Sequence, residues 1–348
     1  MRYLYMSLMI LWIGALSAQG QLSPLPITTY DYAIPENNVS AIALATGGIN
    51  VTDALDPFAS YGNPALLAKN EATMLFLAYR LADEEDLGFW DAVSVSNFLS
   101  DKQFKYFTLV TKQAAISYQP MASLNISEYD ANTGESMYYD YKLDKVQFSL
   151  GISDNNWPNI HAGLNLKYLS GRLVYLVEHR AGSQFIRDHF IDDKVKGFSS
   201  DLGVVYKTGD TVFGLAAYDI LSRLWWENYP ARSIQRRIAT GVQYGSGSST
   251  TSLGIQSKIS SKPETTYHVG YNYRVNWDQT SLSNSDTVKQ GMDLRAGLYS
   301  QDFYGADNIN ITLGSGYHYQ MFRFDFSLNT KGLKLADSEF LFSLGLGF

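Results

Sequence analysis

Strict alternation of apolar residues with small or polar residues constrains this chain more than any other feature. In the final segment one face carries only large apolar side chains, those of Phe340, Phe342, Leu344, Leu346 and Phe348. The residues between them are mostly small. Because successive side chains of a β-strand point to opposite faces, a period of two predicts a strand with one apolar face.

The preceding segment repeats the pattern, with Phe322, Phe324 and Phe326 opposite Arg323 and Asp325. A water-soluble β-sandwich also alternates, because one face of each sheet packs into its core. The large apolar residues favour instead a membrane barrel, whose outward side chains lie in lipid. A soluble exported β-protein is the alternative.

Alternating segments recur along most of the chain. Besides the two above, they cover 73–81, 104–112, 114–123, 143–152, 159–170, 198–207, 211–221, 234–245, 250–259, 266–275, 291–300 and 308–317. The total of about fourteen is even, as single-chain bacterial barrels require. The predicted fold class is all-β: a transmembrane antiparallel β-barrel of about 14 strands over residues 72–348.

The connections give an independent indication. Such barrels alternate short periplasmic turns with longer outer loops. Short candidates lie at 208–210, 245–249 and 319–320, and longer stretches lie between them at 82–103, 124–142, 171–197 and 222–233. One stretch, 276–290, is long where a short turn is due. The alternation otherwise predicts outer loops over the four longer stretches.

The first twenty residues are typical of a secretory signal peptide. Arg2 supplies the positive charge, residues 4–16 are apolar, and Ala18 and Gly20 are small residues suited to cleavage. An N-terminal anchor helix is the alternative, although the apolar run is shorter than a membrane span. No later stretch is apolar enough for a spanning helix. The sequence therefore predicts export to the outer membrane of a Gram-negative-type bacterium.

Composition excludes several kinds of chemistry. The chain has no cysteine, which rules out disulfides and thiolate ligands, and its net charge of -7 gives no reason to expect a nucleic-acid partner. Glu178, His179, Asp188, His189 and Asp192 gather in one expected loop, but their spacing matches no metal motif. No nucleophile arrangement stands out. We expect no metal, no cofactor and no enzymatic activity.

Residues 21–71 differ from the rest, since they are irregular and lack alternation. They contain Gly47-Gly48, acidic residues at Asp53 and Asp56, and the turn Asn63-Pro64-Ala65. This stretch resembles the start of the FadL-like outer-membrane proteins, which include fatty acid transporters and PorV/PorQ-type proteins. The resemblance extends in layout over most of the mature chain, but few specific residues carry it. No long hydrophobic outer hatch is apparent, although 82–103 could be a short one.

The resemblance implies that residues 21–71 form a plug in the barrel lumen. Gly47 and Gly48, without a Cβ, would let the backbone pass close to the wall, and Pro64 would fix a bend after Asn63. A chain that ends on Phe348 within an amphipathic strand also resembles outer-membrane proteins, in which this residue is a signal to the barrel-assembly machinery.

Charged residues opposite the apolar faces are expected to point into the lumen. They are His268, Arg274, Asp293, Arg295, Arg323 and Asp325. Charges inside a barrel can pair across adjacent strands or line a water path. Interior pairing is the plainer interpretation, and a substrate path is the alternative.

Three functions follow from this fold. The resemblance implies either passage of hydrophobic small molecules across the outer membrane or a non-enzymatic scaffold that binds secreted proteins. A general porin is the third, and a plug counts against it. The expected partners are outer-membrane lipid, the assembly machinery, and either small hydrophobic molecules or secreted proteins.

Overall fold

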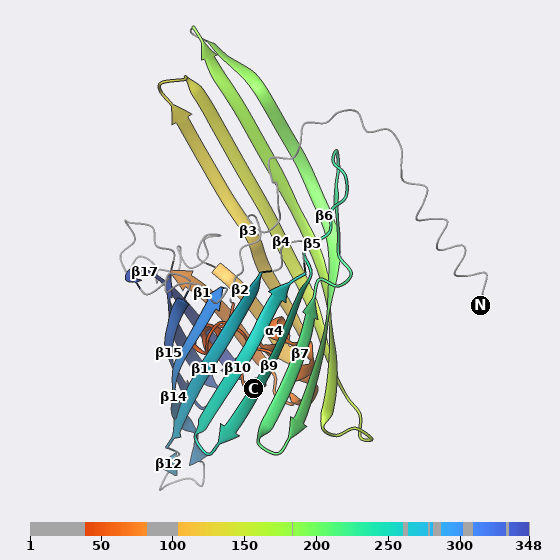
Figure 1. The fold of residues 1–348 in the computed structure, drawn as a ribbon, viewed down its shortest axis with the longest axis vertical. Helices are drawn as coiled ribbons and strands as arrows, with labels where there is room; N and C mark the ends of the chain where they lie inside the picture. The colour runs from red at the N-terminus through yellow and green to blue at the C-terminus, as the bar shows by residue number, and fades with distance from the viewer. Residues whose placement is uncertain are drawn as a thin grey trace, which may run out of the picture.

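The computed structural model describes residues 39–81, 104–182, 184–259, 264–277, 279–280, 287–301, 309–331 and 334–347, and they form a closed β-barrel (Figure 1). The expected signal peptide 1–20, residues 21–38, the loop 82–103 and Phe348 lie outside the described residues. The domain boundaries at residues 20 and 71 therefore stay predictions.

Short helices precede the strands. They are α3 (Ala41–Ala45), α4 (Ala59–Gly62) and the 3-10 helix η1 (Pro64–Lys69). The strands of the first half are β1 (Met74–Leu81), β2 (Phe104–Thr111), β3 (Ala114–Asp130), β4 (Glu135–Ser153), β5 (Ile160–Ala181), β6 (Gln184–Thr208), β7 (Thr211–Tyr218) and β8 (Arg223–Trp226). Those of the second half are β9 (Arg237–Ser246), β10 (Ser249–Lys258), β11 (Thr265–Asn276), β12 (Gln279–Thr280), β13 (Thr287–Val288), β14 (Gln290–Gln301), β15 (Ile309–Tyr319), β16 (Phe322–Lys331) and β17 (Lys334–Gly347).

Each barrel strand pairs with its neighbour in antiparallel register, and pairing of β5 with β6 and of β1 with β17 closes the ring. The main sheet has 15 strands; 14 form the ring, and the short β8 adds to the edge of β6. Closure leaves no free sheet edge in the membrane, which a lipid environment demands. The prediction of an all-β, 14-stranded antiparallel barrel is confirmed.

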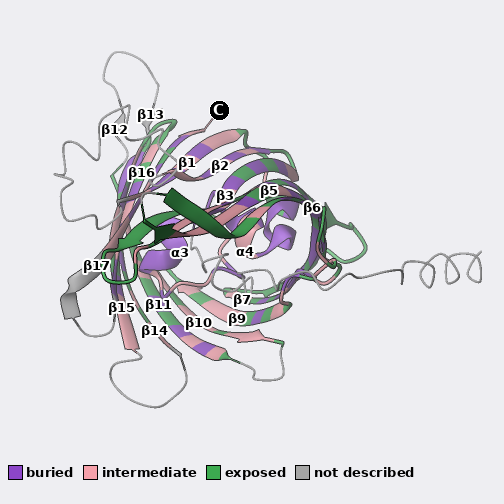
Figure 2. Ribbon diagram, turned by 90° about the horizontal axis from the view of Figure 1, so that it is seen from above, coloured by how far each residue is buried: buried purple, intermediate pink, exposed green. Residues whose placement is uncertain are grey.

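The two faces of the wall differ as the alternation predicts. On β16, Phe322 and Phe324 face outward and are exposed, while Asp325 and Ser327 are buried inside the ring. The same division holds around the barrel (Figure 2). The large apolar side chains thus face the surroundings instead of a second sheet, which excludes the soluble sandwich.

Connections at one end are short, as expected of the periplasmic end. Turns at 112–113, 209–210, 247–248 and 320–321 are tight, whereas 277–289 is long and carries the β12–β13 hairpin. The long connection at 276–290 is therefore real and not a shift of register. Among the described residues, no helix has the length and apolar character needed to cross a membrane.

The prediction of outer loops over 124–142 and 171–197 is wrong. Instead β3 and β4 continue far past the rest of the ring to a turn at 131–134, and β5 and β6 extend as far as Ala181 and Gln184 (Figure 1). Along β4 the polarity of the faces reverses near Asp144. Towards the periplasm Lys145 and Gln147 point inward and Phe148 points outward, but above it Tyr141 and Leu143 are the buried side chains.

The same reversal occurs on the neighbouring strands at the same level. Asp144 is paired with Ser170 on β5, which is paired with Lys196 on β6. Below these residues the outward side chains are mostly apolar, whereas just above them the buried inward side chains Leu143, Leu173 and Val195 are apolar. Since lipid favours apolar outward faces and water favours polar ones, this row marks the outer limit of the membrane-facing wall.

Residues 39–70 lie inside the ring of strands (Figure 2). Helix α3 packs against β14 to β17, and η1 packs against β3 to β6. Phe58 and Leu44 join Phe76, Tyr106 and Leu341 of β1, β2 and β17 in one apolar cluster. The described part of the N-terminal segment thus occupies the lumen; that it closes the lumen stays a prediction.

Candidate functional site

A row of glycines on the inner wall receives the N-terminal segment. Nine successive strands around the ring each place one glycine against residues 45–68, namely Gly151, Gly163, Gly203, Gly214, Gly241, Gly254, Gly270, Gly297 and Gly314. At every one, an added Cβ would lie within 3.0 Å of an atom of that segment. We call residues 45–68 the belt, because they follow the wall at the level of this glycine row.

The residues of the predicted plug motif lie in the belt. Gly47 and Gly48 have φ values of 90° and 85°, a left-handed backbone that favours glycine, and the Gly47 N–H donates to Thr312 Oγ1 over 3.2 Å. Asn63 Nδ2 donates to the carbonyl oxygens of Val51 at 2.9 Å and of Val204, on β6, at 3.3 Å. These contacts fix the belt both to itself and to the wall.

Pro64 begins η1, and Asn63 caps it, because Asn63 Oδ1 accepts a hydrogen bond from the Ala65 N–H at 3.1 Å. Asn63 itself is extended, with φ -156° and ψ 108°, as a residue before proline should be. The Asn63-Pro64-Ala65 turn therefore places the start of η1 against Gly163 and Gly203.

His268 contacts the belt directly. Its Nδ1 lies 2.5 Å from the carbonyl oxygen of Gly47, its Nε2 lies 2.7 Å from Thr266 Oγ1, and its ring stacks on Tyr299. It does not meet Arg274, which lies on the same strand nearer the periplasm. His268 is therefore a contact between wall and belt.

The other five predicted lumen charges form one network at the periplasmic end. Asp293 Oδ1 lies 2.6 Å from Arg274 Nε, and Asp293 Oδ2 lies 2.7 Å from an Arg295 nitrogen. Asp325 lies 2.9 Å from Arg295 and 2.8 Å from Arg323. Both carboxylates and Arg295 are buried. Three cations and two anions so placed hold β11, β14 and β16 together.

This network also holds the belt. Arg323 donates to the backbone carbonyl of Leu55 at 3.2 Å. The structure thus brings Arg274, Asp293, Arg295, Arg323 and Asp325 together as interior pairs, and leaves His268 apart.

A second buried network was missed from the sequence. Lys167 Nζ lies 2.6 Å from Asp201 and 3.0 Å from Asp219. Asn165 donates to Asp201 and to the backbone carbonyl of Ser60, both at 2.9 Å. The signal was present, since Asn165 and Lys167 alternate with the outward residues Leu164, Leu166 and Tyr168.

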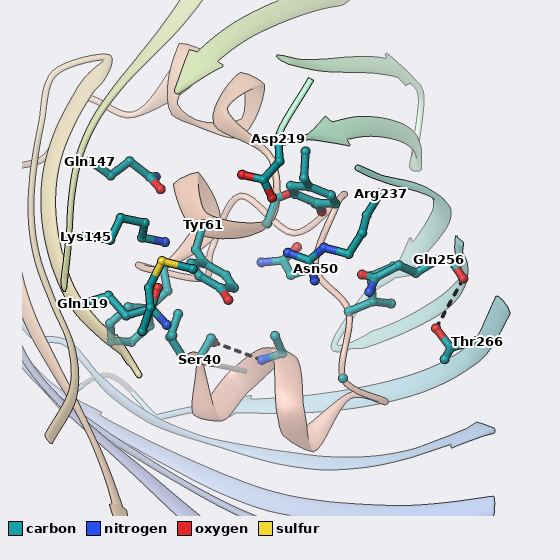
Figure 3. Close-up of a pocket in the computed structure, with 18 of the residues that line it drawn as sticks. Ser40, Asn50, Tyr61, Gln119, Lys145, Gln147, Asp219, Arg237, Gln256 and Thr266 are labelled. Atoms are coloured by element: carbon teal, nitrogen blue, oxygen red, sulfur yellow. Dashed lines mark hydrogen bonds between the residues drawn. The ribbon is translucent and has the colours of Figure 1, made fainter. Parts of the chain in front are cut away.

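The lumen on the outer side of the belt contains a cavity of about 160 Å³. Figure 3 shows Lys145, Gln119 and Gln147 on one side of it and Arg237 and Gln256 on the other. The Lys145 ammonium lies over the Tyr61 ring, 4.8 Å from its centroid. We call this space the outer cavity; its wall is polar, but Tyr61 and Tyr218 supply aromatic surface.

An apolar cluster lies at the outer end of the lumen. It comprises Ala122, Tyr141, Leu143, Leu169, Leu173, Val195, Leu224, Trp226 and Ile234. Leu224 and Trp226 of β8 cover the inward faces of β4, β5 and β6, and Trp226 stacks on Tyr141. Ile234 and the adjoining Met121 also line the outer cavity, so the apolar cluster lies next to the outer cavity.

A smaller cavity of about 40 Å³ lies on the periplasmic side of the belt. Its wall residues include Gln243, Thr250, Ser252 and Asn272. We call this space the inner cavity.

Asp56 fixes the shape of the belt. Its carboxylate accepts hydrogen bonds from Ser40 Oγ at 2.6 Å, Asn50 Nδ2 at 2.9 Å and the Phe58 N–H at 2.9 Å. Burial outweighs these hydrogen bonds and raises the pKa of Asp56 from 3.8 to about 6. The folded protein therefore binds this proton more tightly than the unfolded chain does.

This difference predicts a pH-dependent stability. The contribution of Asp56 to the free energy of unfolding is full below pH 3.8, falls as the pH rises towards about 6, and is lost above that. Asp56→Asn should remove this decline, as measured by the half-time of thermal unfolding on gels between pH 4 and pH 8. Asp53→Asn, also in the belt, is the control and should keep the decline. A decline that survives in Asp56→Asn would contradict this assignment.

The acidic and histidine residues at 178–192 lie on the projecting β5–β6 hairpin. His179 Nδ1 is 2.5 Å from Asp188 Oδ2, and Asp192 pairs with Arg172 at 2.7 Å. Within the described part of the chain, no three such side chains converge as metal ligands. The expected lack of metals, cofactors and catalysis stays a prediction.

No family model matches this sequence. No curated protein matches it either. Solved structures do match its fold. The toluene transporter TbuX of Ralstonia pickettii has a TM-score of 0.54 and 12% identity over 88% of this chain and 97% of its own. The toluene transporter TodX of P. putida has a TM-score of 0.53 and 11% identity over 90% and 99%. A FadL homologue of Pseudomonas aeruginosa has a TM-score of 0.52 and 13% identity over 91% and 99%.

At this level of identity the likeness concerns the fold. The barrel resembles outer-membrane transporters of Gram-negative bacteria, and the prediction of a FadL-like barrel is confirmed as a fold. The narrower PorV/PorQ assignment stays a prediction.

Proposed function

We propose that this protein is a channel that carries hydrophobic small molecules across the outer membrane. The observation that carries the proposal is the inward-facing apolar cluster, which adjoins the outer cavity at Met121 and Ile234. A porin that passes hydrophilic solutes has a polar, water-filled interior. Apolar residues at the outer end of the lumen instead favour capture of apolar solutes from water.

The polarity of the projecting hairpins supports the same conclusion. Just above the Asp144–Ser170–Lys196 row, the buried side chains Leu143, Leu173 and Val195 face inward, and the outward side chains Lys142, Arg172 and Lys194 face water. They therefore extend an apolar inner surface beyond the membrane. Strand β8, with Leu224 and Trp226, covers this surface and is placed to act as its outer closure.

The fold relatives support the proposal by analogy, since two of them are toluene transporters. Uptake of radiolabelled toluene and of a long-chain fatty acid should be measured in a Gram-negative host without its own channel for either. Uptake of at least one above the empty-vector level is expected. Conductance and hydrophilic-solute uptake without uptake of either probe would favour the porin. Co-purification with secretion components, without uptake, would favour the scaffold.

Trp226→Ala should weaken capture. Loss of a buried indole removes apolar contact area, so the probe concentration that gives half-maximal uptake should rise about tenfold. Trp225→Ala is the matched control, because Trp225 is adjacent in sequence but faces outward against Phe198. Equal effects of the two substitutions would contradict a capture role for the inward face.

A further inference from the structure

We propose that the substrate crosses the belt along the inner wall of β9, β10 and β11, and that the side chain of Ile49 closes this path. The inference rests on the proposed transport function and adds the route and the closing residue. The outer and inner cavities lie on opposite sides of the belt, and both are lined by Ala43, Ile49 and Asn50. These three residues are thus the partition between the two spaces.

The inward positions of β10 show how thin the partition is. Counting from the periplasmic turn, Thr250 and Ser252 line the inner cavity, and Gln256 and Lys258 line the outer cavity. Between them lies Gly254, where an added Cβ would be 2.9 Å from Ile49 Cγ2. Along β10, a single inward-facing position, Gly254, therefore separates the two cavities, and the Ile49 side chain occupies the space beside it.

The strands on either side repeat this order. On β11, Asn272 lines the inner cavity, Gly270 contacts the belt at Thr46, and His268 and Thr266 line the outer cavity. On β9, Gln243 and Arg237 lie on opposite sides of Gly241 in the same way. The partition therefore extends over three strands as a single layer of chain.

Of the three partition residues, Ile49 is the one that polar contacts do not fix. Asn50 donates to Asp56 and accepts from the Asp53 N–H, both at 2.9 Å. Ala43 lies in α3, where its N–H donates to the Ser40 cap. Ile49 is half-buried, has an apolar side chain and follows two glycines of positive φ. An apolar side chain across a narrow pore closes it by excluding water.

The wall beside the partition offers no sideways exit. Strand β10 pairs with β9 and β11 without a shift of register, from Ser249 to Lys258 and from Ser249 to Ser257 respectively. A molecule in the outer cavity at this level therefore does not leave the lumen between β9, β10 and β11.

Cysteine substitution tests the path without relying on a variant that could misfold. The chain has no cysteine, so Ile49→Cys would carry its single thiol. A bulky methanethiosulfonate reagent should react with this thiol and lower toluene uptake about tenfold, and dithiothreitol should restore it. Val51→Cys is the matched control, because Val51 is a belt residue that packs on Gly241 and lines neither cavity.

Planar-bilayer conductance gives a second readout that needs no substrate. Ile49→Gly should raise single-channel conductance about tenfold over wild type, whereas Val51→Ala should not change it. Uptake by Ile49→Cys that persists after complete thiol modification would overturn the route, and so would a thiol that does not react. Absence of toluene and fatty acid uptake in wild type would overturn the proposed function, and the conductance measurement would still decide whether Ile49 closes the lumen.

Discussion

Replacing Gly163 with valine is expected to prevent the barrel from reaching its folded, heat-modifiable form. A Cβ at this position would lie 2.3 Å from the Ala65 nitrogen and 2.3 Å from the Pro64 carbonyl carbon. Both are backbone atoms, so no side-chain rotation relieves the clash. We expect a loss of about 3 kcal/mol or more in the free energy of unfolding, at the upper end of overpacking effects.

The measurement is the fraction of folded protein on unboiled gels, followed by urea unfolding in detergent. Gly245→Val is the matched control, since Gly245 lies on β9, where the nearest atom to an added Cβ is the Asp210 carbonyl oxygen at 3.9 Å. That variant should fold nearly as wild type does. Equal behaviour of the two variants would mean that the belt does not lie against the glycine row.

Asp293→Ala is the second substitution with a large expected effect. Asp293 is 1% exposed and neutralises Arg274 and Arg295, and Arg295 is itself buried. Removal of the Asp293 carboxylate leaves the three arginines of the network with the single carboxylate of Asp325, and the excess buried positive charge costs about 3–5 kcal/mol. The free energy of unfolding in urea should fall by that amount, and the belt contact through Arg323 should weaken.

A double variant distinguishes lost charge balance from lost packing. Adding Arg295→Met to Asp293→Ala removes the excess buried cation and should recover part of the stability. Asp192→Ala breaks an ion pair that lies on the exposed hairpin, and it should leave unfolding unchanged within error. If Asp293→Ala were as mild as Asp192→Ala, the interior network would not stabilise the barrel.

The fold was predictable because its main determinant is local. Outward Phe322, Phe324 and Phe326 alternate with inward Arg323 and Asp325, and both sets lie where the period of two places them. Every strand has lipid on one side and a polar lumen on the other, so the alternation of outward apolar and inward polar or small residues recurs around the ring. The strand count and the lumen orientation of the charges follow from it.

The projecting hairpins were missed because their polarity is reversed. Residues 124–142 and 171–197 still alternate, but their buried apolar side chains, such as Tyr141, Leu173 and Val195, face inward, and outward neighbours such as Lys142, Arg172 and Lys194 are polar. Long outward apolar runs define a membrane strand in sequence, and these segments have none. In the sequence, a strand that continues beyond the membrane therefore resembles a loop.

The site itself could be predicted only in part. The belt glycines Gly47 and Gly48 and the turn at Asn63 and Pro64 are visible as a motif, but their partners in the wall are not. Many of the strands contain a glycine, so Gly163 and Gly297 do not stand out in the sequence, and only the structure shows that they lie at one level. Long-range contacts of this kind, and the cavities on either side, depend on the closed ring.

The belt also limits the order in which the molecule can form. Its backbone and side chains contact strands from β4 to β15, at gaps too narrow for even one methyl group. We expect the belt to dock before the ring closes, because an open sheet lets the chain reach the whole glycine row without threading the finished cylinder. The last hairpins would then close around it. The N-terminal segment would in this way set the circumference of the barrel.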